Sequence, residues 1–332
     1  MMMSFAEAGQ PEIALQHELA VQHELAVRAV ASLNSSAGFS AAGLRELLML
    51  RAIATSVRRG ASAMIALLRP DDSSGDLLGF SRMYRNAASR ARAGVVPTID
   101  LLADLSGPIP QPTASHAASR EPDGTSSEQS AVATSQATAQ AAARITSLVR
   151  EPATRLPVVL KSALATSAIL REFGAGASAH ASLACSLLLC VGGATADAWL
   201  PIPAHALASG QPDPESTGPV LQVLGTIARE AQAMEAGLAK ARALQAEDES
   251  RVRTAYKRAA WSALDMLALL SHNLTLTIPD AARALGQTIP TSGAAVARLA
   301  RLGIVREVTG RRRSRCFVYG AVIDALAPDE AR

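Results

Sequence analysis

The most constraining part of this 332-residue sequence lies near its C-terminal end, where strand-like and helix-like patterns follow one another at short intervals. Apolar residues alternate with threonine over 274–278, which predicts a short strand. Pro279 and Asp280 favour the first turn of a helix, and Gly286 suits its C-terminal cap. A second helix is predicted over 290–302, because a helical apolar pattern follows a proline and ends before another glycine.

Two further strands are predicted over 305–308 and 316–319, and they are close enough to form a hairpin. The turn between them, residues 309–315, contains four arginines. A helix, a short turn with a glycine, a second helix and a hairpin follow the spacing of a winged helix-turn-helix module. We therefore predict such a module over residues 256–326, within a C-terminal domain that covers 251–332.

This C-terminal domain has a surplus of positive charge. Residues 251–332 contain 13 Lys and Arg against 6 Asp and Glu, a net charge of +7. The whole chain carries +3, so residues 1–250 carry −4. A local basic surplus on an otherwise slightly acidic chain is typical of a domain that binds a polyanion, and DNA is the predicted partner.

The predicted DNA contacts lie on the second helix and at the tip of the hairpin. Small hydroxyl residues at a helix N-terminus suit phosphates or base edges, and arginines at a hairpin tip suit phosphates or a narrow minor groove. The predicted contact residues are Thr291, Ser292, Ala295, Arg298, Arg301, Arg311, Arg312, Arg313 and Arg315, whereas Val296, Leu299 and Leu302 are predicted to point inward. Two alternatives stay open, namely a protein-docking module and a solvated hairpin with no binding role.

The rest of the chain is predicted to be helical, which makes the fold class mainly α. Alanine and leucine are abundant and aromatic residues make up only 3%, a composition that favours helices over strands. We expect an N-terminal helical extension over 1–40 and a helical domain over 41–250, interrupted by a flexible low-complexity loop over 107–135. The predicted helices cover 44–68, 77–92, 98–105, 136–150, 156–171, 178–191, 219–247 and 250–271.

One segment, residues 173–196, contains no Asp, Glu, Lys or Arg and is long enough to cross a bilayer. It also contains His180, three serines and several glycines, which lower its transfer energy into lipid. We therefore predict a buried central helix here, and no membrane partner. The first residues lack the basic and apolar regions of a signal peptide, so we expect a cytoplasmic protein.

No metal site is predicted from the histidines or the cysteines. The hexapeptide Gln-His-Glu-Leu-Ala-Val occurs twice, over 16–21 and 22–27. Its six-residue step turns His17 and His23 about 240° apart on a helix, so they face different directions. A solvated helix is the expected structure. Cys185, Cys190 and Cys316 lack metal-ligand spacing and fit small core residues in a reducing compartment.

Several stretches resemble bacterial Fic-domain proteins. Residues 305–319, Val-Arg-Glu-Val-Thr-Gly-Arg-Arg-Arg-Ser-Arg-Cys-Phe-Val-Tyr, closely resemble the winged-helix tail that many of these proteins carry. Residues 52–68 are similar to the family's inhibitory-helix region, and residues 156–165 resemble the helix that leads into its active-site loop. The resemblance extends over about residues 44–326, with a gap at the low-complexity stretch. It implies an all-helical, Fic-like body before the C-terminal module.

The family's catalytic loop, His-Pro-Phe-x-Asp/Glu-Gly-Asn-Gly-Arg-x-x-Arg, is degenerate in this sequence. In the family, the histidine is the general base, the acid holds Mg²⁺, and the glycines and arginines bind phosphates. The corresponding residues are 171–182, where only Phe173 and Gly176 match. Arg171 stands in place of the base and cannot accept a proton at neutral pH. Ala175 replaces the metal ligand, and Ala179 and Ser182 replace both arginines.

The inhibitory region is altered in a related way. If Thr55 matches the first residue of the family's Ser/Thr-x-x-x-Glu-Gly motif, Arg59 replaces the glutamate that pairs with the second loop arginine. Both halves of that ion pair are then missing. The resemblance therefore implies a nucleotide site without its catalytic residues, and we expect no cofactor.

Together these patterns predict a DNA-binding regulator built on a catalytically inactive, Fic-like body. Two other functions stay open: an antitoxin-like module that binds another protein, and a divergent transferase of AMP with a rebuilt site. Self-association as a homodimer is a further expectation.

Overall fold

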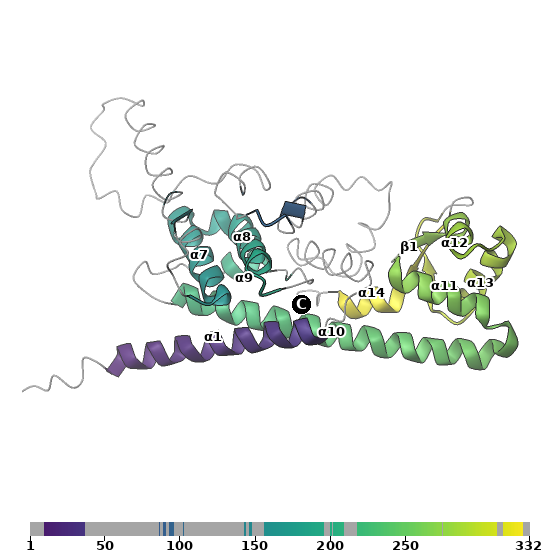
Figure 1. The fold of residues 1–332 in the computed structure, drawn as a ribbon, viewed down its shortest axis with the longest axis horizontal. Helices are drawn as coiled ribbons and strands as arrows, with labels where there is room; N and C mark the ends of the chain where they lie inside the picture. The colour runs from purple at the N-terminus through teal and green to yellow at the C-terminus, as the bar shows by residue number, and fades with distance from the viewer. Residues whose placement is uncertain are drawn as a thin grey trace, which may run out of the picture. The chain divides into compact units, whose positions relative to one another are not determined.

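A computed structural model describes residues 10–36, 86, 89–90, 93–95, 102, 143, 146–147, 156–195, 200, 202–208, 218–273, 275–310 and 315–327 (Figure 1). These residues are mostly helical, with a small three-stranded antiparallel sheet near the C-terminal end. The prediction of a mainly α fold is thereby confirmed. The predicted helices over 44–68, 77–92, 98–105 and 136–150, and the low-complexity loop, lie wholly or almost wholly outside the described residues.

The chain forms two compact units, and each is described by itself. The first unit contains residues 1–32, 83–196 and 202–231, and the second contains residues 33–82, 197–201 and 232–332. The elements of the first unit are α1 (Gln10–Ser36) up to residue 32, α7 (Val158–Phe173), η1 (Ala175–Ala177), α8 (Ser178–Val191), α9 (Ala204–Ala208) and the beginning of α10 (Gly218–Tyr256).

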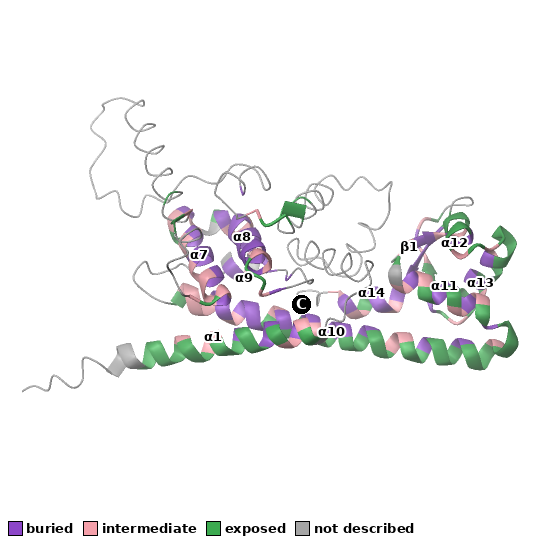
Figure 2. Ribbon diagram, viewed as in Figure 1, coloured by how far each residue is buried: buried purple, intermediate pink, exposed green. Residues whose placement is uncertain are grey.

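The core of the first unit is the pair of helices α7 and α8, which pack against each other. All residues of α8 from His180 to Leu189 are buried, as Figure 2 shows. The prediction of a buried central helix in the uncharged segment is therefore confirmed. No helix in the described part of the chain is both long and apolar enough to cross a membrane.

Small side chains allow α7 and α8 to approach closely. A Cβ atom on Gly192, which follows α8, would lie 2.3 Å from Cγ1 of Val158 at the start of α7. Four buried hydroxyls in this pair donate hydrogen bonds to backbone carbonyls, which removes the penalty of burying them unpaired, whereas the buried Ser167 hydroxyl has no such partner among the described residues. Thr166 donates to the Ser162 carbonyl at 2.7 Å, and Ser182 donates to the carbonyl of Ile202.

Helix α10 is longer than the sequence predicts. The expected break between residues 247 and 250 is wrong, because α10 continues without interruption for 39 residues. The segment across the expected break contains no glycine or proline, and its Ala, Glu, Gln and Arg residues favour a helix. The helix ends at Tyr256, and Lys257 then adopts a φ of 44°, a left-handed backbone that a helix cannot continue through.

The second unit contains the C-terminal part of α10 and all the elements after it. These are η2 (Lys257–Ala259), α11 (Trp261–His272), β1 (Thr275–Thr277), α12 (Ile278–Leu285), α13 (Ile289–Arg301), β2 (Val305–Glu307), β3 (Cys316–Tyr319) and α14 (Gly320–Leu326). The predicted strands and the two short helices are confirmed to within two residues at their ends. Helix α14 was not predicted.

Strand β3 lies in the centre of the sheet, in the order β1-β3-β2, and both pairings are antiparallel. Leu276 is opposite Phe317 on one side, and Arg306 is opposite Val318 on the other. Every residue of β3 is buried, as expected for a central strand covered on both faces. Helices α11, α12 and α13 pack on one another beside this sheet.

The last part of α10 packs closely within the second unit. A Cβ atom on Gly237 would lie 3.1 Å from Cδ2 of Leu326 in α14, so the missing side chain leaves room for this helix. Further along, Asp248 is only 3% exposed and accepts a hydrogen bond of 2.7 Å from Tyr319 in β3. This carboxylate is therefore part of the core of the second unit.

Candidate nucleic-acid interface

The short helices α12 and α13 each begin at a threonine cap. The Thr277 hydroxyl accepts a hydrogen bond from the Asp280 backbone amide, and the Thr288 hydroxyl accepts one from that of Thr291, both at 3.3 Å. A hydrogen bond from Thr277 and the nearby Arg283 lower the pKa of Asp280. Gly286 ends α12 with a φ of 61°, a conformation that glycine adopts without strain.

Helix α13 has one buried face and one exposed face. Its buried residues are Ser292, Ala295, Val296 and Leu299. At about 100° per residue, the opposite face contains Pro290, Ala294, Ala297 and Arg301, all exposed. Thr291 is exposed beside them near the N-terminus of the helix. The exposed face therefore carries small side chains, a hydroxyl and one positive charge, and no acid.

Two of the predicted contact residues are buried inside the unit. Ser292 is 0% exposed, and its hydroxyl donates to the side-chain oxygen of Gln287 at 3.3 Å. Ala295 is also 0% exposed. Ser292 thus connects α13 to the turn that precedes it. The helical pattern of small residues did not distinguish the two faces, since alanine occurs on both.

Arg298 is half-buried, and its guanidinium group is bound within the unit. It donates to the Ala259 carbonyl at 3.1 Å and to the Ser262 hydroxyl at 2.9 Å. The same group lies 5.8 Å from the centre of the Tyr256 ring, while the Tyr256 hydroxyl donates to the Arg298 carbonyl at 3.0 Å. These contacts hold α13 against the segment that joins α10 to α11.

The base of the β2–β3 hairpin is held by a carboxylate and a hydroxyl. Glu307 accepts hydrogen bonds from the amides of Thr309 and Gly310, at 2.8 and 2.9 Å, and from the Thr309 hydroxyl. These hydrogen bonds lower the pKa of Glu307, and the bond from the Thr309 hydroxyl has the largest effect. The positive charge of Arg315 lowers this pKa further. The Thr309 hydroxyl also accepts from the Cys316 amide at 3.2 Å, which joins the two arms of the turn.

The arginines of the hairpin turn are described only in part. Arg311, Arg312 and Arg313 lie outside the described residues. Arg315 is exposed, and its guanidinium carbon lies 5.3 Å from the centre of the Phe317 ring. Arg301 is exposed at the C-terminal turn of α13.

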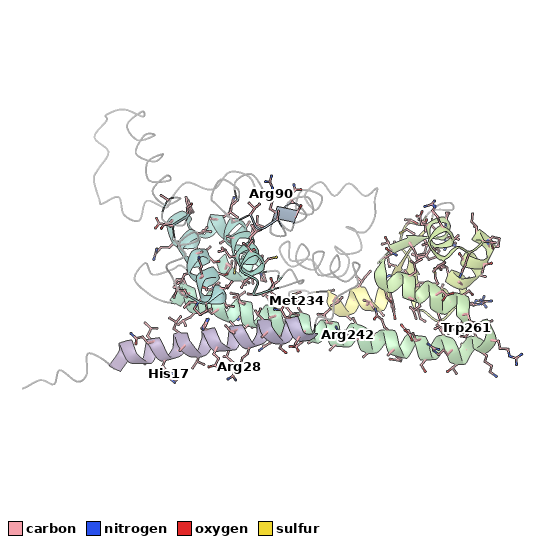
Figure 3. All side chains as sticks on the ribbon, viewed as in Figure 1. His17, Arg28, Arg90, Met234, Arg242 and Trp261 are labelled. Atoms are coloured by element: carbon pink, nitrogen blue, oxygen red, sulfur yellow. The ribbon has the colours of Figure 1, made fainter. Side chains whose placement is uncertain are left out.

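Sequence reasoning missed a basic and aromatic corner between α10 and α11. Lys257 and Arg258 are exposed there, and Trp261 is 71% exposed. Figure 3 labels Trp261 at the beginning of α11. The bonds from Arg298 to Ala259 and Ser262 place this corner beside α13. The dipeptide Lys257-Arg258 and the nearby tryptophan were visible in the sequence, but only the tertiary contacts connect them to α13.

Residues 171–182, which the sequence predicts to be a degenerate Fic-like loop, form the end of α7, η1 and the start of α8. Phe173 is 1% exposed, whereas Arg171 and Gly176 are exposed. Among the residues that the structure describes, no group of three or more His, Cys, Asp and Glu side chains is placed to hold a metal ion. Thr55 and Arg59, of the inhibitory region, lie outside the described residues.

No protein-family model matches this chain. No curated protein matches its sequence either.

Proposed function

We propose that the chain is a DNA-binding regulator whose C-terminal module is a winged helix-turn-helix. The observation that carries the proposal is the order and capping of its elements. Two short helices, each started by a threonine, are followed by an antiparallel hairpin whose turn contains four arginines. The net charge of +7 over residues 251–332 supports a polyanionic partner.

In this proposal α13 is the helix that enters the major groove. Thr291 lies exposed in its first turn, where the positive end of the helix dipole favours a phosphate oxygen. Arg301, at the other end of the exposed face of α13, contacts the phosphate backbone of the DNA. The arginines of the turn, Arg311, Arg312, Arg313 and Arg315, bind phosphates or a minor groove beside the helix.

Arg298 has a different role from the one its sequence position predicts. Because its guanidinium group is bound to Ala259 and Ser262, we assign it as a positioning residue that fixes the angle of α13. Ser292 is left out of the interface because it is buried. Lys257 and Arg258 extend the positive surface along the α10–α11 corner.

In this proposal the helical body that resembles Fic proteins serves only as a scaffold. The side chains that the family uses as base, metal ligand and phosphate ligands are absent from residues 171–182. No contact of the described residues favours nucleotide transfer over a structural use of these helices.

The test is a binding titration of labelled duplex DNA at increasing salt, with sequences enriched from a random pool. Phosphate contacts release counterions, so the logarithm of the association constant is expected to fall linearly with the logarithm of the salt concentration. The triple variant Arg311→Ala, Arg312→Ala, Arg313→Ala is expected to reduce that slope by about 2 to 3 and to weaken binding of every sequence.

The matched control removes three positive charges elsewhere, with Arg90→Ala, Lys161→Ala and Lys240→Ala. The salt dependence of DNA binding by this control variant, given by the same slope, should stay close to that of the unmodified chain. An unmodified chain that binds no duplex at a salt concentration of about 50 mM would contradict the proposal, because nonspecific electrostatic binding is strongest there.

A protein-docking module is the second candidate, and one observation favours it. The exposed face of α13 contains Ala294 and Ala297 in place of residues that read bases, and Ile289 next to it is 58% exposed. An uncharged apolar face can be buried against a protein without the cost of desolvating a charge. Two results together would favour protein docking over DNA binding. First, the unmodified chain binds no duplex. Second, a protein that co-purifies with the chain is lost from the Ala297→Glu variant but retained by the triple arginine variant.

A further inference from the structure

Helix α1 exposes a regular line of side chains that none of the functions above uses. Its members are Ala14, Glu18, Val21, Leu25 and Arg28, which we call the α1 stripe. They are spaced alternately by four and three residues, the spacing of a coiled-coil seam. Val21 is 42% and Leu25 is 44% exposed, so two large apolar side chains face water at its centre.

The α1 stripe is separate from the face by which α1 packs in its own unit. That packed face contains Ala26, Ala29 and Val30, each at most 5% exposed. Figure 2 shows the change along the described part of α1, from mostly exposed residues near its beginning to buried ones further on. Figure 3 shows Arg28 projecting from the free side of the helix.

The charges on the α1 stripe are complementary to those of a second copy in one orientation. Glu18 and Arg28 lie at equal distances on either side of His23. If two copies of α1 lie antiparallel with a two-fold axis at His23, each Glu18 faces an Arg28 of the other copy. The same axis places each Val21 against a Leu25 of the other copy.

A parallel arrangement would not be complementary in this way. It would place Glu18 against Glu18 and Arg28 against Arg28, and like charges in direct contact oppose association. In the antiparallel arrangement, Arg28 would bind Glu18 of the second copy in addition to Glu24 of its own helix, with which it forms an ion pair of 2.5 Å. Within the described part of α1, the ionisable side chains nearest to the α1 stripe besides these two are His17 and Glu24.

The repeated hexapeptide provides the apolar centre of this arrangement. Val21 ends the first copy of the repeat, and Leu25 belongs to the second. Because they are four residues apart, the helix places them on one face. Each copy of the repeat contributes one apolar residue to the α1 stripe, because the six-residue step turns equivalent positions about 240° apart.

We propose that the α1 stripe is a self-association surface, which joins two copies of the chain through an antiparallel pair of α1 helices. The seam spans about 21 Å from Ala14 to Arg28 at 1.5 Å per residue. This length is short for a stable coiled coil, so the expected dimer is weak, with a dissociation constant on the order of 10 µM.

The experiment is sedimentation equilibrium of the full chain over a concentration range that brackets this value. Val21→Asp and Leu25→Asp are expected to weaken the dimer at least about tenfold, since each places a charge in the apolar centre of both copies. Val27→Asp is the matched control. Val27 is 36% exposed but lies about 160° from Leu25 around the helix, so its variant should dimerise like the unmodified chain.

Charge exchange tests the antiparallel register. Glu18→Arg alone and Arg28→Glu alone should each weaken the dimer about tenfold, because each brings two like-charged pairs together. The double variant Glu18→Arg, Arg28→Glu should recover most of the affinity lost in the single variants, since it reverses the sign of both pairs between the copies. The loss of the Arg28–Glu24 ion pair within each helix is shared with Arg28→Glu alone. Circular dichroism of each variant checks that α1 stays helical.

A chain that stays monomeric at about ten times the expected dissociation constant would overturn the proposal. The proposal also fails if the double variant is not restored, or if Val27→Asp and Val21→Asp weaken the dimer equally. None of these outcomes depends on whether the C-terminal module binds DNA, because a chain with Arg311→Ala, Arg312→Ala and Arg313→Ala retains the α1 stripe.

Discussion

The Tyr319 hydroxyl donates a hydrogen bond of 2.7 Å to Asp248, a residue 71 positions earlier in the chain. The second carboxylate oxygen of Asp248 accepts from Arg251 at 2.5 Å, and Arg251 also donates to the Leu302 carbonyl at 2.5 Å. Asp248 and Arg251 of α10 therefore connect three segments of the second unit: the carboxylate binds β3, and the guanidinium group binds the end of α13. This network fixes α13 relative to the sheet.

Tyr319→Phe is expected to lower the free energy of unfolding by about 1 to 3 kcal/mol, because it leaves one oxygen of a buried carboxylate without its donor. Urea denaturation followed by circular dichroism measures the change. Tyr256→Phe is the matched control: it also removes one hydroxyl, but its partner is the half-buried carbonyl of Arg298. A smaller loss, about 0.5 to 1.5 kcal/mol, is expected there. Equal losses of unfolding free energy in the two variants would contradict the role of Asp248 as a buried partner of Tyr319.

Because of the buried Tyr319 hydroxyl, we expect the folded chain to lose stability at alkaline pH. Burial, and then the hydrogen bond to Asp248 and its charge, raise the pKa of Tyr319 well above its ordinary value. In the unfolded chain the phenol ionises near pH 10. The folded state keeps its proton there, so the unfolded state releases more protons and stability falls as the pH rises above about 10. Unfolding titrations between about pH 8 and 11 should show a weaker pH dependence for Tyr319→Phe, and an unchanged dependence would contradict this explanation.

The threonine caps of the two short helices are expected to contribute measurably to stability. Thr277→Ala and Thr288→Ala each remove the oxygen that accepts a backbone amide in the first helical turn. A loss of about 0.5 to 2 kcal/mol is expected for each, measured by thermal denaturation. Thr254→Ala, at an exposed position inside α10, is the control and should change stability by less than about 0.5 kcal/mol. Losses no larger than that of the control would contradict the capping role.

Two arginines of α13 should have separable effects. Arg298→Ala removes the contacts with Ala259, Ser262 and the Tyr256 ring, and it should lower the unfolding free energy by about 1 to 3 kcal/mol. Arg301→Ala removes an exposed side chain and should leave stability within about 0.5 kcal/mol. If the module binds DNA, Arg301→Ala should weaken binding and reduce the salt slope by about 1. A stable Arg298→Ala variant would contradict its positioning role.

Cys185 is expected to be chemically inert in the folded chain. It is 0% exposed, and burial raises the pKa of its thiol to about 12, although a hydrogen bond with Thr166 opposes the shift. The thiolate is the reactive form. In a variant with Cys190→Ser and Cys316→Ser, disulfide-exchange labelling at about pH 8 should be at least a hundredfold slower than in denaturant. Equal rates would show that the α7–α8 core opens readily.

Much of the second unit follows from local patterns. The strand at 275–277, the caps and the two short helices were predicted because proline, threonine and glycine act within a few residues of where they stand. The hairpin followed from two short apolar runs on either side of a basic turn. The pairing of β1 with β3 did not follow, since strand order depends on contacts between residues more than 35 positions apart.

The proposed interface was less accessible to prediction. Thr291 and Arg301 were placed on the exposed face of α13, as their spacing suggested. Arg298 was assigned to the same face, because the sequence does not show that η2 and α11 lie beside it and bind its guanidinium group. Ser292 was misplaced for a related reason: small side chains suit a buried face as well as an exposed one.

The sequence by itself determined the helical character of the chain, the burial of α8 and the order of elements in the C-terminal module. Composition, uncharged runs and capping residues act locally, so a linear reading is enough for them. Only the tertiary structure decided that α10 continues to Tyr256, that Asp248 is a buried partner of Tyr319, and that Arg298 holds α13 in place. These depend on which distant surfaces meet, and the free energy of burying a carboxylate or a guanidinium group is favourable only where partners from other elements surround it.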